Sequence, residues 1–273
     1  MIKWKDVPVK NRKEVYKEIS RDKSLLMKTV MFKDMYKGLE CVVLSCGVST
    51  AEFPKEKIEE FCKDKPVFTV KTATMKYSNI SDICITNLYA TCDFPKERDY
   101  LIFARQEMPL GYENWINPDL VDTDTWSNYK SARHSNSVVN ADRWDENSLQ
   151  KNPFNRIIGP GIMNDMVVPI LVHCGISKVS ILGWDGANIQ DDGSIRHFYD
   201  IEPLYKPEIN YVSNKFNLNN LKSDTNECEQ QIAKNGELSV MRYLRSNDVE
   251  IEILTKNSTV NDAISRNYVL YGE

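Results

Sequence analysis

Residues 41–50 read CVVLSCGVST. The first four are apolar, which is typical of a parallel strand that is buried on both faces of its sheet. The six that follow are small or turn-forming, and Gly47 lets the backbone approach a ligand because it has no Cβ. Backbone amides near the start of a helix favour anions. The stretch therefore predicts a central strand that ends in a ligand-binding loop.

Short apolar runs recur along the chain and alternate with segments of helical periodicity. The expected strands are residues 67–70, 83–86, 100–103, 179–182 and 249–254. The expected helices are residues 10–36, 55–62, 163–173 and 237–245. Because such alternation requires crossover connections, it predicts an α/β fold with a Rossmann-like, mostly parallel sheet. We expect residues 1–273 to form a single nucleotide-binding domain.

Two polar segments interrupt this pattern. Residues 105–155 are rich in Asn, Asp, Ser and Trp, and a structureless loop of that length is uncommon in a compact domain. We expect them to form an inserted polar subdomain that packs on the sheet or covers a site. Residues 188–227 are also polar and loop-like, and we expect a lid there, because closing lids exclude water from reactive donors.

The composition excludes several classes of function. With a net charge of -4 over 273 residues, the chain has no global basic field for nucleic acid. No run approaches the roughly 20 apolar residues of a transmembrane helix, and the first residues lack the apolar core of a signal peptide. None of the seven cysteines forms a C-x-x-C pair, which favours buried free thiols over disulfides or zinc. We expect a cytoplasmic protein.

Polar residues follow the expected strands. In open α/β sheets, ligands bind at the carboxyl ends of the strands, and this sequence places hydroxyls, amides and a glycine there. The residues concerned are Ser45, Cys46, Gly47, Ser49, Lys71, Asn87, Asp185, Asn188, Asn257 and Ser258. Such a ring suits ribose, base edges and phosphate. It predicts a nucleotide site, although the chain has neither G-x-G-x-x-G nor a P-loop motif.

The later motifs occur in a distinctive order. Gly159-Pro160-Gly161 precedes an apolar helix, a strand and Gly183-Trp184-Asp185, and Phe198-Tyr199-Asp200 and Asn257-Ser258 come after them. In this order the chain resembles the bacterial sialyltransferases of the Campylobacter type and, more distantly, the motility-associated flagellin glycosyltransferases. The resemblance implies a GT-A-like variant of the Rossmann-like fold, a CMP-sugar donor, and a reaction without metal or other cofactor.

The resemblance covers residues 40–90 and 156–262 and implies roles for individual residues. Gly47 and Ser49 match the family's nucleotide-binding loop, while Cys46 replaces an asparagine. Other residues at or near the nucleotide-contacting positions of the family are Lys71, Asn87, Gly159 and Gly161. The family's lid histidine has no counterpart, because residues 230–232 read QQI.

Three residues are candidates for the chemistry. His197 is a candidate general base, because the pKa of histidine needs little adjustment to lie near working pH. Asp185 is a second candidate base, or it caps the next turn. Arg196 would neutralise a leaving phosphate, or it is simply solvated. The sequence Asp122-Thr123-Asp124 mimics a D-x-D metal motif, but three short residues match easily by chance, and we expect no metal.

The leading hypothesis is a glycosyltransferase that uses a nucleotide-activated sugar. The hydroxyl of a glycan or another acceptor would attack the anomeric carbon in a single displacement. One alternative is a nucleotidyl- or diphosphate-transferring enzyme on the same sheet. Another is a non-catalytic nucleotide-binding protein. A homo-oligomer is compatible with each of them.

Overall fold

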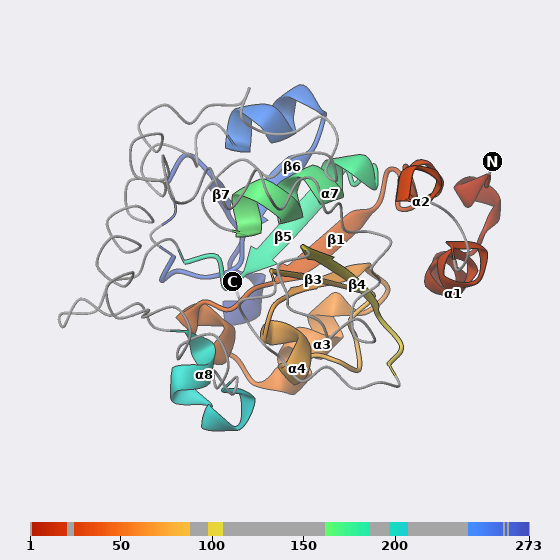
Figure 1. Ribbon diagram of the computed structural model, residues 1–273. Helices are drawn as coiled ribbons and strands as arrows, with labels where there is room; N and C mark the ends of the chain where they lie inside the picture. The colour runs from red at the N-terminus through yellow and green to blue at the C-terminus, as the bar shows by residue number, and fades with distance from the viewer. Residues whose placement is uncertain are drawn as a thin grey trace, which may run out of the picture.

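A seven-stranded sheet forms the centre of the molecule in the computed structural model (Figure 1). The structure describes residues 2–20, 25–87, 98–105, 162–185, 197–206, 240–258, 260 and 262–272. All strands are parallel, in the order β4-β3-β2-β1-β5-β6-β7. Their bounds are β1 Glu40–Leu44, β2 Val67–Val70, β3 Ile83–Asn87, β4 Leu101–Arg105, β5 Lys178–Leu182, β6 Glu250–Ile253 and β7 Ser265–Arg266. The predicted α/β fold with a parallel sheet is thus confirmed.

Six of these strands coincide with predicted ones, with ends that differ by at most two residues. Their short apolar runs are buried because helices cover the sheet on both sides. In β1 the alternation of side chains is visible, because Val43 packs in one apolar cluster while Val42 and Leu44 pack in another. The seventh strand, β7, was not predicted, since a serine and an arginine carry no apolar pattern.

The helices lie on both faces of the sheet. The larger cluster joins β1 to α1 (Val9–Ser20), α2 (Leu25–Phe32), α7 (Val168–His173) and the helical residues 240–246. The smaller cluster joins β1 to α3 (Lys55–Cys62) and η7 (Val269–Tyr271), so that α3 and α7 lie on opposite sides of the sheet (Figure 1). The shorter elements are η1 Trp4–Asp6, η2 Val48–Ala51, α4 Ala73–Lys76, α8 Phe198–Ile201 and η6 Pro203–Tyr205.

Two predicted helices differ in detail from the observed ones. The segment 10–36 was expected to be one helix; the structure describes α1 and α2 within it, with α2 ending at Phe32, and residues 21–24 between them lie outside the described residues. The segment 163–173 begins as a π-helix, Met163–Val167, before α7. Within the described residues, no helix has the length and apolar character needed to cross a membrane.

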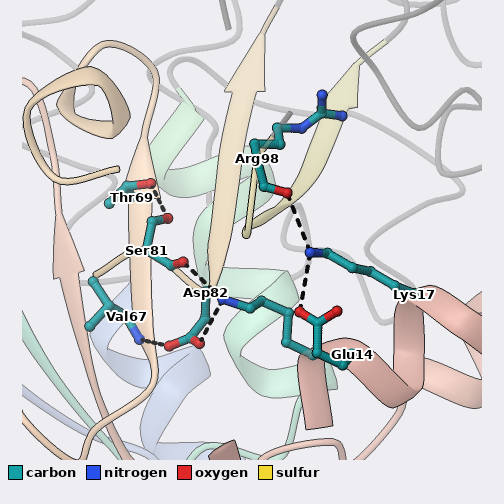
Figure 2. Close-up of polar contacts among 8 residues, drawn as sticks. Glu14, Lys17, Val67, Thr69, Ser81, Asp82 and Arg98 are labelled. Carbon is teal, nitrogen blue, oxygen red and sulfur yellow. Dashed lines mark hydrogen bonds and ion pairs between the residues drawn. The ribbon is translucent and has the colours of Figure 1, made fainter. Parts of the chain in front are cut away.

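Helix α1 is anchored at the amino ends of two neighbouring strands, β3 and β4 (Figure 2). The ammonium group of Lys13 lies 3.8 Å from the Asp82 carboxylate, just before β3. Lys17 donates to the carbonyl oxygen of Arg98, before β4, at 3.4 Å. The carboxylate of Asp82 also accepts a 2.8 Å hydrogen bond from the backbone N–H of Val67, the first residue of β2. These contacts lie at the edge opposite to the carboxyl ends of the strands.

The described cysteines are free and buried, as predicted. They are Cys41, Cys46, Cys62, Cys84 and Cys174. The predicted insert, residues 105–155, lies almost entirely outside the described residues, and of the predicted lid only residues 197–206 are described.

Candidate functional site

The site lies where the direction of the chain across the sheet reverses. The chain leaves β1 to build β2, β3 and β4 on one side, and then returns to build β5, β6 and β7 on the other. Neighbouring strands β1 and β5 therefore send their following loops in opposite directions. Open α/β sheets bind ligands at such a switch point, outside the carboxyl ends of the strands. Here the two loops are residues 45–50, the β1 loop, and residues 183–185, the β5 loop.

Direct hydrogen bonds join the β1 loop to the β5 loop. The backbone N–H of Gly47 donates to the carbonyl oxygen of Gly183 at 2.9 Å. The backbone N–H of Ser49 donates to Oδ2 of Asp185 at 2.8 Å, and the Ser49 hydroxyl donates to Oδ1 at 2.5 Å. The Ser49 hydroxyl oxygen also accepts the backbone N–H of Gly183 at 3.0 Å. The two loops consequently form one rigid unit.

Asp185 has a structural task in this unit. Its side chain is buried, with 4% of the residue exposed, and both of its oxygens accept hydrogen bonds from Ser49. Burial raises the pKa of Asp185, while the bonds from Ser49 act in the opposite direction. Asp185 thus binds the first turn of η2 from the β5 loop, while the turn that follows Asp185 in the chain, which the sequence suggested it could cap, lies outside the described residues. As a base, Asp185 would have to give up a contact with Ser49.

The two glycines of this unit are required by close packing of the loops. A Cβ on Gly47 would lie 2.3 Å from Oδ2 of Asp185 and 2.4 Å from the carbonyl oxygen of Gly183. A Cβ on Gly183, whose φ is +83°, would lie 2.2 Å from the Thr50 hydroxyl. The sequence suggested that Gly47 makes room for a ligand. In the structure, the space on its Cβ side is filled by the β5 loop.

Ser45 and Cys46 are directed into the protein. The thiol of Cys46 donates to the carbonyl oxygen of Val70 at 3.1 Å and lies 3.1 Å from the Thr72 hydroxyl. Burial raises the pKa of this thiol. Ser45 is 6% exposed, and its carbonyl oxygen accepts the Thr50 hydroxyl at 2.7 Å. Both residues were predicted to bind substrate; in the structure the Cys46 thiol supports the β1 loop from below, and Ser45 is buried and bound to Thr50 through its backbone.

His197, the candidate base, lies beside the β1 loop. It forms an isolated antiparallel bridge with Gly47, and the next N–H, that of Phe198, donates to the carbonyl oxygen of Cys46 at 3.0 Å. Its ring stacks on Tyr199 at a centroid distance of 4.7 Å. Its backbone N–H donates to the carboxylate of Asp200 at 2.9 Å.

The charge state of His197 follows from its surroundings. Its pKa is lowered to about 4, mainly by burial and also by the positive charge of Lys71, while Asp200 partly compensates. The imidazole is therefore neutral at pH 7. Lys71 directly follows β2 and has a left-handed backbone with φ of 50°. Lys71 thus lies within electrostatic reach of a neutral imidazole at the switch point.

Asn257 and Ser258, predicted from the end of β6, also reach this edge. The Ser258 hydroxyl donates to the carbonyl oxygen of Trp184 in the β5 loop at 2.7 Å. The Asn257 amide donates to Glu52, just after the β1 loop, at 2.7 Å. Their contacts are made with the protein itself, so both residues hold the ends of β1, β5 and β6 together.

Sequence reasoning missed Glu52 and two of its partners, Thr255 and Tyr271. The carboxylate of Glu52 accepts hydrogen bonds from Thr255 at 2.9 Å and from the Tyr271 hydroxyl at 2.6 Å, in addition to Asn257. The position of Glu52, two residues after the end of the β1 loop, could have indicated it. Nothing local could have indicated Tyr271, because it is 219 residues away from Glu52 in the chain.

The remaining predicted site residues are described only partly or not at all. Asn87 ends β3 at the carboxyl edge, paired with Arg105, and its side chain is not described. The residues Gly159, Gly161, Asn188 and Arg196 lie outside the described part of the chain, as do Asp122 and Asp124. Among the described residues, no group of three or more His, Cys, Asp or Glu side chains could hold a metal ion.

Comparison of the chain with protein-family models, with curated proteins and with solved structures found no match.

Proposed function

We propose that this chain is a glycosyltransferase that binds a nucleotide-activated sugar, with CMP-sugars as the expected donor class, at the carboxyl edge between β1 and β5. The observation that carries the proposal is the position of His197, which is bridged to Gly47 at the switch point of the sheet and lies within electrostatic reach of Lys71. A lysine ammonium is a strong partner for phosphate, and switch points are the usual ligand sites of open parallel sheets.

The proposed reaction is a single displacement. The acceptor hydroxyl attacks the anomeric carbon, the bond between that carbon and the phosphate oxygen breaks, and CMP leaves with the electron pair. Lys71 would hold the phosphate and offset its negative charge. His197 would accept the proton of the hydroxyl, because its imidazole is unprotonated at pH 7. A bound phosphate beside it would raise its low pKa and make it a better base. We assign Asp185 the role of holding the β1 loop in place.

Isothermal titration calorimetry with CMP tests the binding step. Lys71→Met should weaken CMP binding roughly tenfold or more, because a hydrogen bond to a charged group contributes about 1.5–3 kcal/mol. The matched control is Lys63→Met, which removes the same charge from a lysine whose side chain is 66% exposed beside Glu60. It should bind CMP like the wild type. Absence of binding to any cytidine or uridine nucleotide would refute the proposal.

A donor-hydrolysis assay tests the chemical step. Slow hydrolysis of a CMP-sugar by the wild type, lost in His197→Ala while CMP affinity is retained, supports a transferase with His197 as base. Tight CMP binding without turnover in the presence of several hydroxyl acceptors would instead indicate a non-catalytic nucleotide-binding protein.

A further inference from the structure

A buried lysine lies beneath the candidate site. The side chain of Lys76, the last residue of α4, is only 4% exposed. Its Nζ is 2.8 Å from each carboxylate oxygen of Glu202. It also donates to the carbonyl oxygen of Thr50 at 3.2 Å. Buried charges are costly unless they are paired, and within the described residues Lys76 is paired through contacts with two other segments of the chain.

Those two segments form the candidate site. Thr50 closes the β1 loop, and its hydroxyl donates to the carbonyl oxygen of Ser45, where the loop begins. Glu202 belongs to residues 197–206, the docking segment, which also carries His197. The docking segment touches the β1 loop through the bridge between Gly47 and His197 and through the hydrogen bond from Phe198 to Cys46.

Apolar packing supports the same arrangement. Phe198 is fully buried and packs with Cys46 and Ala73, the first residue of α4. The Nζ of Lys76 lies 5.6 Å from the centroid of the Phe198 ring and 5.4 Å from that of Tyr77. Cation–π attraction at such distances adds to the ion pair. Lys76 is thus at the centre of the contact between the docking segment and the rest of the fold.

From this geometry we infer that Lys76 is a positioning residue, whose ion pair with Glu202 fixes the docking segment, and with it His197, against the β1 loop. The inference rests on the proposed function in so far as it concerns the nucleotide site. Among the described residues, the polar contacts of Lys76 are with Glu202 and with the Thr50 carbonyl, so its role is one of positioning. Without the pair, we expect the docking segment to separate from the β1 loop more often.

Hydrogen exchange measured by mass spectrometry on the ligand-free protein tests the positioning role. Peptides that contain residues 198–206 should exchange about tenfold faster in Lys76→Met and in Glu202→Gln, because local opening is governed by local contacts. Lys76→Arg should restore exchange to near the wild-type rate. The matched control is Lys178→Met, which breaks a 3.0 Å ion pair with Glu252 at the amino end of β5. It should leave these peptides unchanged.

The double variant Lys76→Met/Glu202→Gln adds a coupling test. If the two residues act through their ion pair, the double variant should exchange no faster than the more affected single variant, since coupled mutations are not additive. Wild-type exchange of residues 198–206 in Glu202→Gln would overturn the inference even if Lys76→Met failed to fold.

CMP titration separates this inference from the proposed function. We expect an affinity for CMP about tenfold lower in Lys76→Met, which corresponds to about 1.4 kcal/mol, and restored by Lys76→Arg. If the wild type binds no CMP while the exchange results hold, the proposed function fails and the positioning role stands. If the wild type binds CMP and Lys76→Met binds it equally tightly with unchanged exchange, the positioning role fails.

Discussion

Gly47 and Asp185 show how single residues make the two loops one unit. Gly47 leaves room for the Asp185 carboxylate, and that carboxylate holds both the N–H and the hydroxyl of Ser49. The contact can exist only if position 47 has no side chain and position 185 has two acceptor oxygens. The chemical identity of these residues is therefore explained by packing, before any ligand is considered.

Substitution Gly47→Ala should destabilise the fold and disturb the site. The added Cβ would lie 2.4 Å from the backbone oxygen of Gly183, and overpacking of this kind costs about 1–3 kcal/mol. Urea denaturation measures the loss. The control is Gly38→Ala. Its added Cβ would lie more than 4 Å from other atoms, but the residue has a φ of +74°, so the variant should lose only the backbone strain of about 1–2 kcal/mol.

Affinity for CMP should fall in Gly47→Ala and stay unchanged in Gly38→Ala. An equal loss of CMP affinity in both variants would contradict the role given to Gly47.

The depressed pKa of His197 predicts a pH dependence of stability. Its pKa falls from 6.5 to about 4 on folding, so the unfolded chain binds more protons between these values. The contribution of His197 to stability is therefore fully present above pH 6.5 and is lost as the pH falls towards 4. The shift corresponds to about 3 kcal/mol at most.

A comparison with His197→Gln isolates this effect. Glutamine stays neutral at every pH. When the free energy of unfolding of the variant is subtracted from that of the wild type, the effects of the carboxylates and of the other histidines, which both proteins share, therefore drop out. We expect this difference, measured by urea denaturation, to change steadily between pH 6.5 and 4 and to be constant above pH 7. A stability difference between the two proteins that stays constant from pH 7 to pH 4 would show that His197 is not desolvated in the folded state.

At the scale of elements, α1 is joined to the sheet by a few polar contacts at the amino edge (Figure 2). Asp82→Ala should cost about 1–3 kcal/mol, because it leaves the N–H of Val67 without its side-chain acceptor and removes the ion-pair partner of Lys13. Glu14→Ala is the control on the same helix, since its carboxylate is 62% exposed and such pairs contribute about 0–1 kcal/mol. Urea denaturation of both variants is the measurement, and equal losses would contradict the role of Asp82.

The elements also show what the sequence could and could not predict. Strands such as β1 and β2 were predictable because burial on both faces of a parallel sheet requires an uninterrupted apolar run. Strand β7 was not, because it is short and polar. In the site, the polar residues after each strand were predictable from topology. The purpose of Gly47 was not, because its neighbour Asp185 is more than a hundred residues away and their contact depends on the folded sheet.

For the whole molecule, the pairing of β1 with β5 is the seam between two halves of the sheet. The strands β2, β3 and β4 follow β1 outward on one side, and β6 and β7 follow β5 on the other. Along this seam every residue of β1, from Glu40 to Leu44, is paired with one of β5. The candidate site continues the seam beyond the strand ends, through the bonds between the β1 loop and the β5 loop. The position of the site is thus a consequence of the topology.

This architecture predicts a gradient of hydrogen-exchange protection across the sheet. Peptides that contain β1 or β5 should exchange slowest, because these strands are flanked on both sides and four of the five residues in each are buried. Peptides that contain β7 should exchange much faster, since this strand has two residues, neither of them buried, and pairs with β6 alone among the described strands. Mass spectrometry of the ligand-free protein at neutral pH gives the rates. Protection of β7 equal to that of β1 would mean that the seam is not the most stable part of the molecule, and that the site is not built on its most rigid pair of strands.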